Sequence, residues 1–328
     1  MKDRAARIRT GITRKVSAEA SDDPRIRTDM AHLRQLESQA RRISFLPRQP
    51  SSSVLNGRHA SRLRGRGLNF EELRDYLPSD DTRNIDWKVT ARTGVPHIRV
   101  YTEERDRPTL IVVDQRMSMF FGSVLNMKSV TAAECAALAA YRIFDQGDRV
   151  GGIVFGDEVI AEIRPTRGRQ ALTGFIDALA RANALLSADA PAVEPISMNR
   201  VLQSVARLAP RNHLVLVFSD FDIVDETTER LIAGLARRND LVLGLVSDPF
   251  ADAFPADRRI VVSDGQLQVE IDTADKKTHL ALQNMAQGRL AAIMDWQRRF
   301  GFPVMPLSSA EDSVDQMRRL MGLAGGRR

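Results

Sequence analysis

Two aspartates stand directly after apolar runs of the kind that form buried strands. Leu110–Val113 are apolar and end at Asp114, and the run 213–219 is followed by Asp220 and, two residues later, Asp222. A short apolar run bounded by turn residues is typical of a buried parallel strand. Because the carboxyl ends of such strands form the edge where open α/β folds hold their ligands, we expect both aspartates at one sheet edge.

Hydroxyl groups are available near these aspartates. Ser118 lies in the loop after Asp114, and Ser197 precedes a helix expected at 199–208. Mg²⁺ takes oxygen ligands, usually one or two carboxylates together with water. Asp114, Ser118, Ser197 and Asp220 together meet that requirement, so we predict a Mg²⁺ site there. Each aspartate alone has a simpler explanation, since strand-end aspartates often cap helices or form turns.

Arg116 stands between Asp114 and Ser118. This stretch resembles the metal-ion-dependent adhesion motif of von Willebrand A domains, Asp-x-Ser-x-Ser, with Arg116 in place of the middle Ser. A guanidinium is permanently charged and suits carboxylates. Turned inward, Arg116 could bridge Asp114 and Asp220 and replace the cation; turned outward, it could leave a weakened metal site. A third alternative is that it binds an acidic residue of a partner.

Motifs of common enzymes are absent from the sequence. It contains no G-x-x-x-x-G-K-[ST] phosphate loop and no G-x-S-x-G nucleophile elbow. The five histidines are scattered without ligand spacing, and Asp80-Asp81 follow Pro78 and Ser79 as in a turn. A metal-dependent hydrolase would need a base beyond the nominated ligands. We therefore expect a non-enzymatic protein with no small-molecule substrate.

Strand and helix patterns alternate from residue 107 onward. This order predicts an α/β fold, with a mostly parallel sheet covered by helices on both faces. A strand–turn–strand pattern near 258–272, with Asp264-Gly265 at its turn, predicts a hairpin insertion. The expected strands are 109–114, 149–155, 158–163, 213–219, 241–247 and 303–307, and the expected helices are 124–145, 168–182, 199–208, 226–238, 276–299 and 311–322.

The positive charge of the chain is concentrated near its start. Residues 1–70 hold 16 Lys and Arg against 6 Asp and Glu, a balance of +10, whereas the whole chain carries +6. We interpret residues 1–53 as a basic arm with one amphipathic helix at 28–43. Such an arm could bind nucleic acid or an anionic surface. Phe45 and Phe70 are the only aromatics in residues 1–70, so base stacking is poorly supported.

Targeting and redox signals are also lacking. No apolar run is long enough to span a membrane, and residues 1–20 lack the apolar centre of a signal peptide. Cys135, the single cysteine, lies in an alanine-rich helical stretch and is expected in the core. These features predict a cytoplasmic protein.

Residues 54–106 combine dense charge with large apolar residues, which predicts a small, mostly β module held by ion pairs. Arg74, Arg83 and Arg92 could pair with nearby acids; these acids are Asp80, Asp81, Asp86, Glu103 and Glu104.

This segment resembles the signature of the bacterial domain-of-unknown-function 58 family, S-x-x-x-G-x-G-x-x-F-x-x-L-R-x-Y-x-P-x-D-D-x-R-x-I-D-W-x-x-x-A-R. Matching positions include Arg74, Tyr76, Asp80, Asp81, Arg83, Asp86, Trp87 and Arg92. The resemblance covers roughly residues 55–325. It implies a von Willebrand A-like domain at 107–328 preceded by the β module at 54–106.

The resemblance also implies a partner. Members of the family are commonly encoded with MoxR-type AAA+ ATPases and are thought to remodel or activate client proteins in a chaperone-like manner. Our first hypothesis is an adaptor that binds such an ATPase and a client through the Asp114–Ser118–Ser197–Asp220 edge, with Arg116 and Asp222 contacting the partner. The alternative is a binder of nucleic acid or anionic surfaces that acts through the basic arm.

Overall fold

The computed structural model describes residues 23–43, 58–59, 68–77, 80, 82–104, 108–157, 159–187, 194–251, 259–263, 268–272 and 276–321. Glu103 and Glu104 lie in a strand whose side chains are not described, and Asp81 lies outside the described residues.

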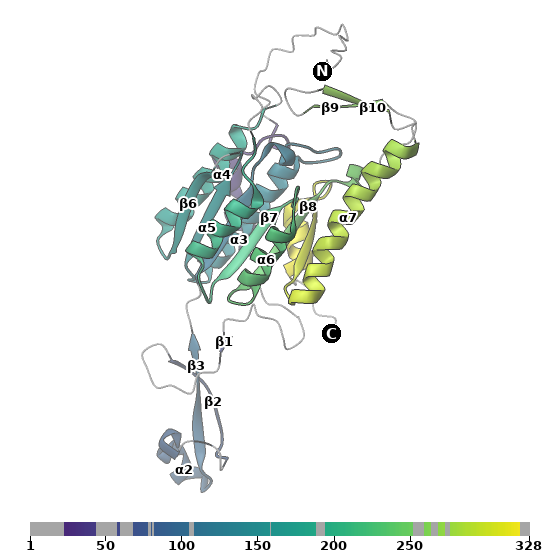
Figure 1. The fold of residues 1–328 in the computed structure, drawn as a ribbon. Coiled ribbons are helices and arrows are strands. Elements are labelled where there is room, and N and C mark those ends of the chain that lie inside the picture. Colours follow the sequence, from purple (N-terminus) through teal and green to yellow (C-terminus); the bar gives the residue numbers. More distant parts are fainter. Residues whose placement is uncertain are drawn as a thin grey trace.

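Six strands form the central sheet, in the order β11-β8-β7-β4-β5-β6 (Figure 1). Five run parallel, and β6 at one edge pairs antiparallel with β5. Every residue of β4, β5 and β7 is buried, as expected for strands covered on both faces. The strands are β4 (Thr109–Asp114), β5 (Val150–Phe155), β6 (Val159–Thr166), β7 (Leu214–Ser219), β8 (Asp240–Ser247) and β11 (Val304–Ser308).

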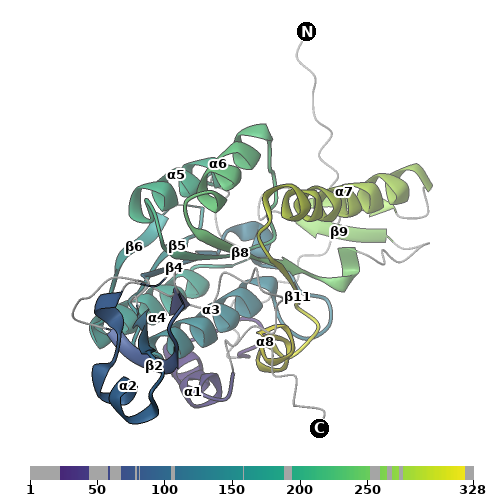
Figure 2. The same cartoon turned by 90° about the horizontal axis from the view of Figure 1, so that it is seen from below.

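Helices cover both faces of this sheet, as the two core clusters and Figure 2 show. One face carries α1 (Met30–Ala40), α3 (Lys128–Asp145), α4 (Arg169–Ala184) and α8 (Ser313–Met321). The other carries α5 (Met198–Leu208), α6 (Glu226–Ala236) and α7 (Lys276–Phe300). The predicted α/β fold with a mostly parallel sheet is confirmed, and its arrangement is consistent with a von Willebrand A-like fold.

The predicted strands and helices of this domain are present, and their ends differ by a few residues. The largest difference is at α3, which begins at Lys128 and not at residue 124. Gly122 lies so close to the Asn126 backbone that a Cβ there would collide with it. The chain therefore forms a tight loop before the helix, where the apolar pattern alone suggested helix.

The helix predicted in the basic arm forms as α1 and belongs to the main core. Leu33, Leu36 and Ala40 are buried against α3 and α4. A boundary at residue 53 therefore does not follow the packing, because residues 30–43 are part of the main domain. Residues 1–22 and 44–57 lie outside the described residues. Cys135 is buried on α3, as predicted.

The small module is a three-stranded antiparallel sheet of order β1-β3-β2, with one short helix. Its strands are β1 (Arg58–His59), β2 (Leu68–Asp75) and β3 (His97–Glu104), and its helix is α2 (Trp87–Thr93), after the 3₁₀ turn η1 (Thr82–Asn84). Figure 1 shows this module projecting from the main sheet, at the end where β4 begins.

The predicted hairpin insertion is also present. It consists of β9 (Arg259–Ser263) and β10 (Gln268–Asp272), paired antiparallel between β8 and α7. Two further 3₁₀ turns are η2 (Met117–Met119) and η3 (Pro249–Ala251). Among the described residues, no helix has both the length and the apolar character that crossing a bilayer requires.

One ion pair joins α1 to α3 and generates a pH prediction. His32 Nε2 lies 2.5 Å from Glu134 Oε1, and the Glu134 side chain is mostly buried. The hydrogen bond to Glu134 raises the pKa of His32 above its ordinary 6.5. This pair therefore stabilises the fold fully below pH 6.5, and the stabilisation is lost as the pH rises through the raised value.

We expect the stability of the wild type to fall as the pH rises above 6.5, by roughly 1–2 kcal/mol from this contact. His32→Gln should flatten that part of the profile, measured by thermal denaturation monitored by circular dichroism. Arg318→Gln, which breaks an exposed ion pair with Asp315, serves as the control and should keep the shape of the wild-type profile. Identical profiles for wild type and His32→Gln would contradict the assignment.

Candidate functional site at the carboxyl edge of the sheet

Asp114 and Asp220 lie at the same sheet edge, as predicted. Asp114 is the last residue of β4, and Asp220 follows the last residue of β7, its parallel neighbour. Asp114 is fully buried and Asp220 is 4% exposed. Two carboxylates held this deep in a protein require compensating charges or donors.

Arg116 turns inward and binds Asp114. Its Nη2 lies 2.7 Å from Asp114 Oδ2, its Nε lies 3.0 Å from Oδ1, and its backbone N–H also donates to Oδ1 at 3.0 Å. The guanidinium lies over the Phe155 ring, 5.6 Å from the centroid, and Nη1 reaches the carbonyl of Ile196 at 3.5 Å. Arg116 is 4% exposed. Of the three alternatives for Arg116, the structure shows the one in which the side chain turns inward.

Arg116 does not bridge the two aspartates, because Lys128 occupies the second one. Lys128 Nζ lies 2.7 Å from Asp220 Oδ2, and the Asp222 backbone N–H donates to Oδ1 at 3.1 Å. Lys128 is the first residue of α3, an end where the helix dipole disfavours a cation. Its position is explained by the aspartate that it neutralises.

Ser219 completes the surroundings of Asp114. Its hydroxyl donates to Asp114 Oδ2 at 2.6 Å and accepts from the Phe221 backbone N–H at 2.8 Å. Both oxygens of Asp114 therefore accept hydrogen bonds within the protein. Asp114, Arg116, Lys128, Asp220 and Ser219 form what we call the edge cluster, with two negative and two positive side chains.

The two carboxylates differ in their electrostatics. Burial raises the pKa of Asp114, and the Arg116 guanidinium opposes that rise. Burial is also the largest influence on Asp220 and acts in the same direction, but the Lys128 ammonium, the Asp222 N–H and the Arg116 guanidinium together outweigh it, so the pKa of Asp220 lies below its ordinary value. Asp220 therefore stays ionised at neutral pH and keeps its pair with Lys128.

The oxygen atoms at this sheet edge are not arranged to bind a divalent cation. The carboxylate oxygens that would bind it already face N–H groups of two cationic side chains. Ser197 is exposed and caps α5, accepting from the Arg200 N–H. Within the described residues, no group of three or more His, Cys, Asp or Glu side chains could hold a metal ion. Ser118 Oγ is buried and has no hydrogen-bond partner among the described residues.

The two residues predicted to contact a partner differ in exposure. Arg116 is buried and bound to Asp114, so its guanidinium is not presented to a partner in this structure. The Asp222 side chain is 43% exposed and accepts from Arg289 Nη1 of α7 at 3.2 Å. Asp222 can therefore be reached from outside, although an arginine already accompanies it.

Two polar groups beside the edge cluster were not predicted. Gln115 donates to the Ser129 carbonyl and accepts from Asn183 Nδ2, while Asn183 Oδ1 accepts from the Thr28 N–H. This chain of contacts joins β4 to α3, α4 and the segment before α1. A polar residue directly after a buried strand is the only sequence signal, and it does not reveal its partner.

The second unpredicted group is centred on Asp248, directly after β8. It accepts from the hydroxyls of Ser123 and Ser309, each at 2.5 Å, and from the Ser123 and Phe250 N–H groups. Burial raises its pKa, but these hydrogen bonds outweigh burial and bring it below the ordinary value. Asp248 therefore fixes the β4–α3 loop against the ends of β8 and β11.

Comparison with known proteins assigns the chain to a protein family. Residues 72–291, about two thirds of the chain, match the family described as "Protein of unknown function DUF58". The chain belongs to the DUF58 family. Its curated relatives include uncharacterized proteins of Mycobacterium bovis and Mycobacterium tuberculosis, each 28% identical over 245 residues, which is 75% of this chain and 72% of the relative.

The DUF58 signature residues gather in the small module, away from the edge cluster. Arg74 binds Asp80 through two hydrogen bonds of 2.8 Å, and Asp80 also accepts from the Leu77 N–H. Asp86 is buried and caps α2 by accepting from the Lys88 and Val89 N–H groups. The predicted Arg74–Asp80 pair is thus present. Asp86 is used as a cap.

The remaining signature residues are less buried. Tyr76 is half-buried and its N–H donates to the Pro96 carbonyl, and Arg83 and Arg92 are exposed. Trp87 is 68% exposed at the start of α2. Among the described residues of the module, backbone pairing of β2 with β3 and the Arg74–Asp80 ion pair are present, and Trp87 is exposed to solvent.

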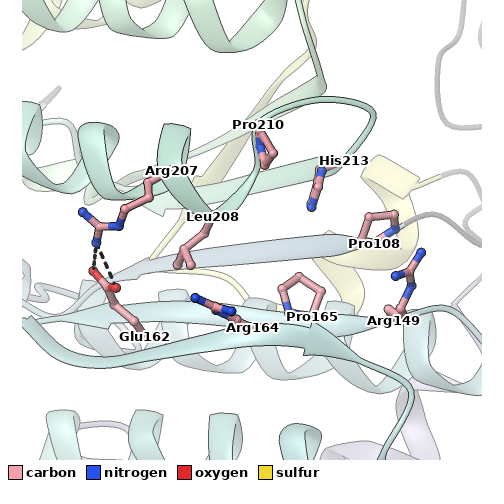
Figure 3. Close-up of a pocket in the computed structure, with 9 residues that line it drawn as sticks. All are labelled: Pro108, Arg149, Glu162, Arg164, Pro165, Arg207, Leu208, Pro210 and His213. Atoms are coloured by element: carbon pink, nitrogen blue, oxygen red, sulfur yellow. Dashed lines mark hydrogen bonds and ion pairs between the residues drawn. The ribbon is translucent and has the colours of Figure 1, made fainter.

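A groove opens at the opposite, amino edge of the sheet (Figure 3). It has a volume of about 680 Å³ and lies between β6 and the end of α5. Three arginines and one glutamate contribute charge, and Glu162 pairs with Arg207 across the groove at 3.0 Å. The lining residues are Pro108, Arg149, Glu162, Arg164, Pro165, Arg207, Leu208, Pro210 and His213.

The edge cluster makes a stability prediction. Arg116→Met removes the cation and leaves Asp114 buried, so the free energy of unfolding should fall by roughly 3–5 kcal/mol. The double variant Arg116→Met, Asp114→Asn removes both charges and should recover part of that loss. Urea denaturation measures both. The control Arg318→Met, which breaks an exposed pair with Asp315, should cost under about 1 kcal/mol. A loss that small for Arg116→Met would contradict the buried pair.

Proposed function

We propose that this DUF58 protein is a non-enzymatic, cytoplasmic adaptor that binds a MoxR-type AAA+ ATPase and a client protein for chaperone-like remodelling. The carboxyl edge of the main sheet is the binding surface. The observation that carries this proposal is a set of exposed apolar side chains on ordered loops around the edge cluster.

These side chains come from loops that follow the neighbouring strands β4 and β7. Phe121, Val124 and Leu125 of the first loop are 42%, 69% and 38% exposed, and Ile223 of the second is 78% exposed. The first loop is held by Ser123 on Asp248 and by the Phe121 ring, 5.7 Å from that of Phe250. Exposed apolar groups on two loops at the same edge of the sheet favour a protein–protein contact.

Ile223 is also conformationally strained. Its φ is +56° and that of Phe221 is +51°, in the left-handed region that β-branched residues avoid. A strained, exposed isoleucine contributes little to folding. Strained backbone tends to persist at functional sites, which supports a role for this loop in binding.

Ile223→Asn tests the surface. Asparagine tolerates positive φ, so the free energy of unfolding should rise by about 1 kcal/mol, while the affinity for the purified ATPase should fall about tenfold through loss of apolar contact. Val124→Asp should weaken binding as well. Biolayer interferometry and urea denaturation provide the two measurements.

Val95→Asn is the matched control, because Val95 is 48% exposed on the small module and should leave binding unchanged. Loss of binding with Val95→Asn and full binding with both edge variants would place the contact on the module. Binding unaffected by all three variants would contradict the carboxyl edge as the docking surface.

A second candidate function is binding to nucleic acid or an anionic surface. The arginine-lined groove at the amino edge favours it, because three of its four charged Arg and Glu residues are positive. The basic arm would add to this charge. Such binding should weaken steeply with salt.

Truncation separates the two functions. Removal must stop at residue 22, because α1 and Ile43 are part of the core. The adaptor proposal expects deletion of residues 1–22 to leave ATPase binding unchanged. The alternative expects loss of salt-sensitive binding to a fluorescent single-stranded oligonucleotide or to anionic vesicles, measured beside the full chain.

A further inference from the structure

Two cationic side chains of the edge cluster, Arg116 and Lys128, together carry the same charge as a divalent cation. Arg116 and Lys128 each approach one aspartate at 2.7 Å, and their side chains are 5% and 13% exposed. Two carboxylates and two cations sum to zero, the same balance that a doubly charged metal ion would give. The aspartates are therefore neutralised without any bound ion.

We infer that Arg116 and Lys128 take the place of a divalent cation, and that the edge is a latent cation site blocked chiefly by Arg116. The fold does not need the guanidinium to shape the turn, because the Arg116 backbone N–H itself donates to Asp114 Oδ1 at 3.0 Å. A smaller residue at position 116 would keep that turn and free both oxygens of Asp114 from the guanidinium.

Two hydroxyl groups near Asp114 could supply further oxygen ligands to such an ion. Ser118 Oγ is buried without a hydrogen-bond partner among the described residues, only four positions after Asp114. Ser219 Oγ lies 2.6 Å from Asp114 Oδ2. With a hydroxyl introduced at position 116, carboxylate and hydroxyl oxygens would form the hard ligand set that Mg²⁺ and Mn²⁺ prefer.

Lys128 is a second, weaker block. Its ammonium lies on Asp220 and would repel a cation placed between the aspartates. Removing it together with Arg116 should therefore raise the affinity for a metal ion beyond that of the Arg116 variant alone. The inference also deepens the proposed function, because it implies that partner binding by the wild type should be insensitive to chelators. This one expectation rests on the proposed function.

The experiment compares four proteins in the absence of any partner, so its result is independent of ATPase binding. They are the wild type, Arg116→Ser, Arg116→Ser with Lys128→Met, and the control Arg116→Met, which lacks a hydroxyl. The melting temperature of each protein is measured with MnCl₂, with MgCl₂ and with chelator. Mn²⁺ binding is measured by titration followed by electron paramagnetic resonance.

The wild type should neither bind Mn²⁺ at this edge nor shift its melting temperature. Arg116→Ser should melt lower than the wild type and recover by roughly 5 °C or more with saturating Mn²⁺, and the double variant should bind about tenfold more tightly. Arg116→Met should melt lower without recovering. Equal responses of Arg116→Ser and Arg116→Met would overturn the latent site.

The wild type provides a test that does not depend on a variant folding well. Stoichiometric Mn²⁺ binding by the wild type that is lost in Asp220→Asn would overturn the inference, since the two side chains would then not replace the ion. Absence of wild-type binding supports it. If metal responses follow expectation while ATPase binding fails, the proposed function is wrong and the charge replacement stands.

Discussion

The buried pair between Arg116 and Asp114 is the interaction on which the carboxyl edge depends. Asp114 ends a central strand with no solvent contact, and the guanidinium, Ser219 and one backbone N–H together satisfy its carboxylate. Through Nη1 the same guanidinium reaches the segment before α5. Because an unpaired buried charge is costly, these contacts favour one arrangement of three loops. Because these contacts fix the loops, the exposed apolar residues on the loops are not needed to hold them in place.

The same strand end also anchors the segment before α1. Gln115, next to Asp114, contacts the Ser129 carbonyl and Asn183, and Asn183 accepts from the Thr28 N–H. Helix α1 then buries Leu33 and Leu36 in the core that contains α3 and α4. The hydrogen bonds of Gln115 and Asn183 therefore contribute both to the stability of the main domain and to the geometry of the edge. The small module precedes β4 and lies at the other end of that strand, so the signature residues and the edge cluster lie at opposite ends of β4 (Figure 1).

Sequence reasoning located the strands, the helices and the strand-end aspartates because burial on both faces produces continuous apolar runs. It could not assign the partner of each polar side chain, since that depends on contacts between distant segments. Lys128 was missed because the helix was predicted to begin at residue 124, so the sequence did not place a cation at a helix start, where a nearby carboxylate would be expected. Ser197 looked like a ligand and is a helix cap, a role that the same residue type and position serve equally well. The exposure of Trp87 and the positive φ of Ile223 have no local signature at all.

The charge balance of the edge bears on how it can bind a partner. A bound metal ion offers an open coordination position to a partner's carboxylate, but Arg116 and Lys128 use their donors on Asp114 and Asp220 and offer none. Burial lowers the dielectric around these pairs, so salt screens them weakly. The exposed side chains of the edge loops include the apolar Phe121, Val124 and Ile223, beside the carboxylate of Asp222. Recognition at such a surface depends on shape and apolar area, and the charge network beneath it supplies rigidity and not attraction.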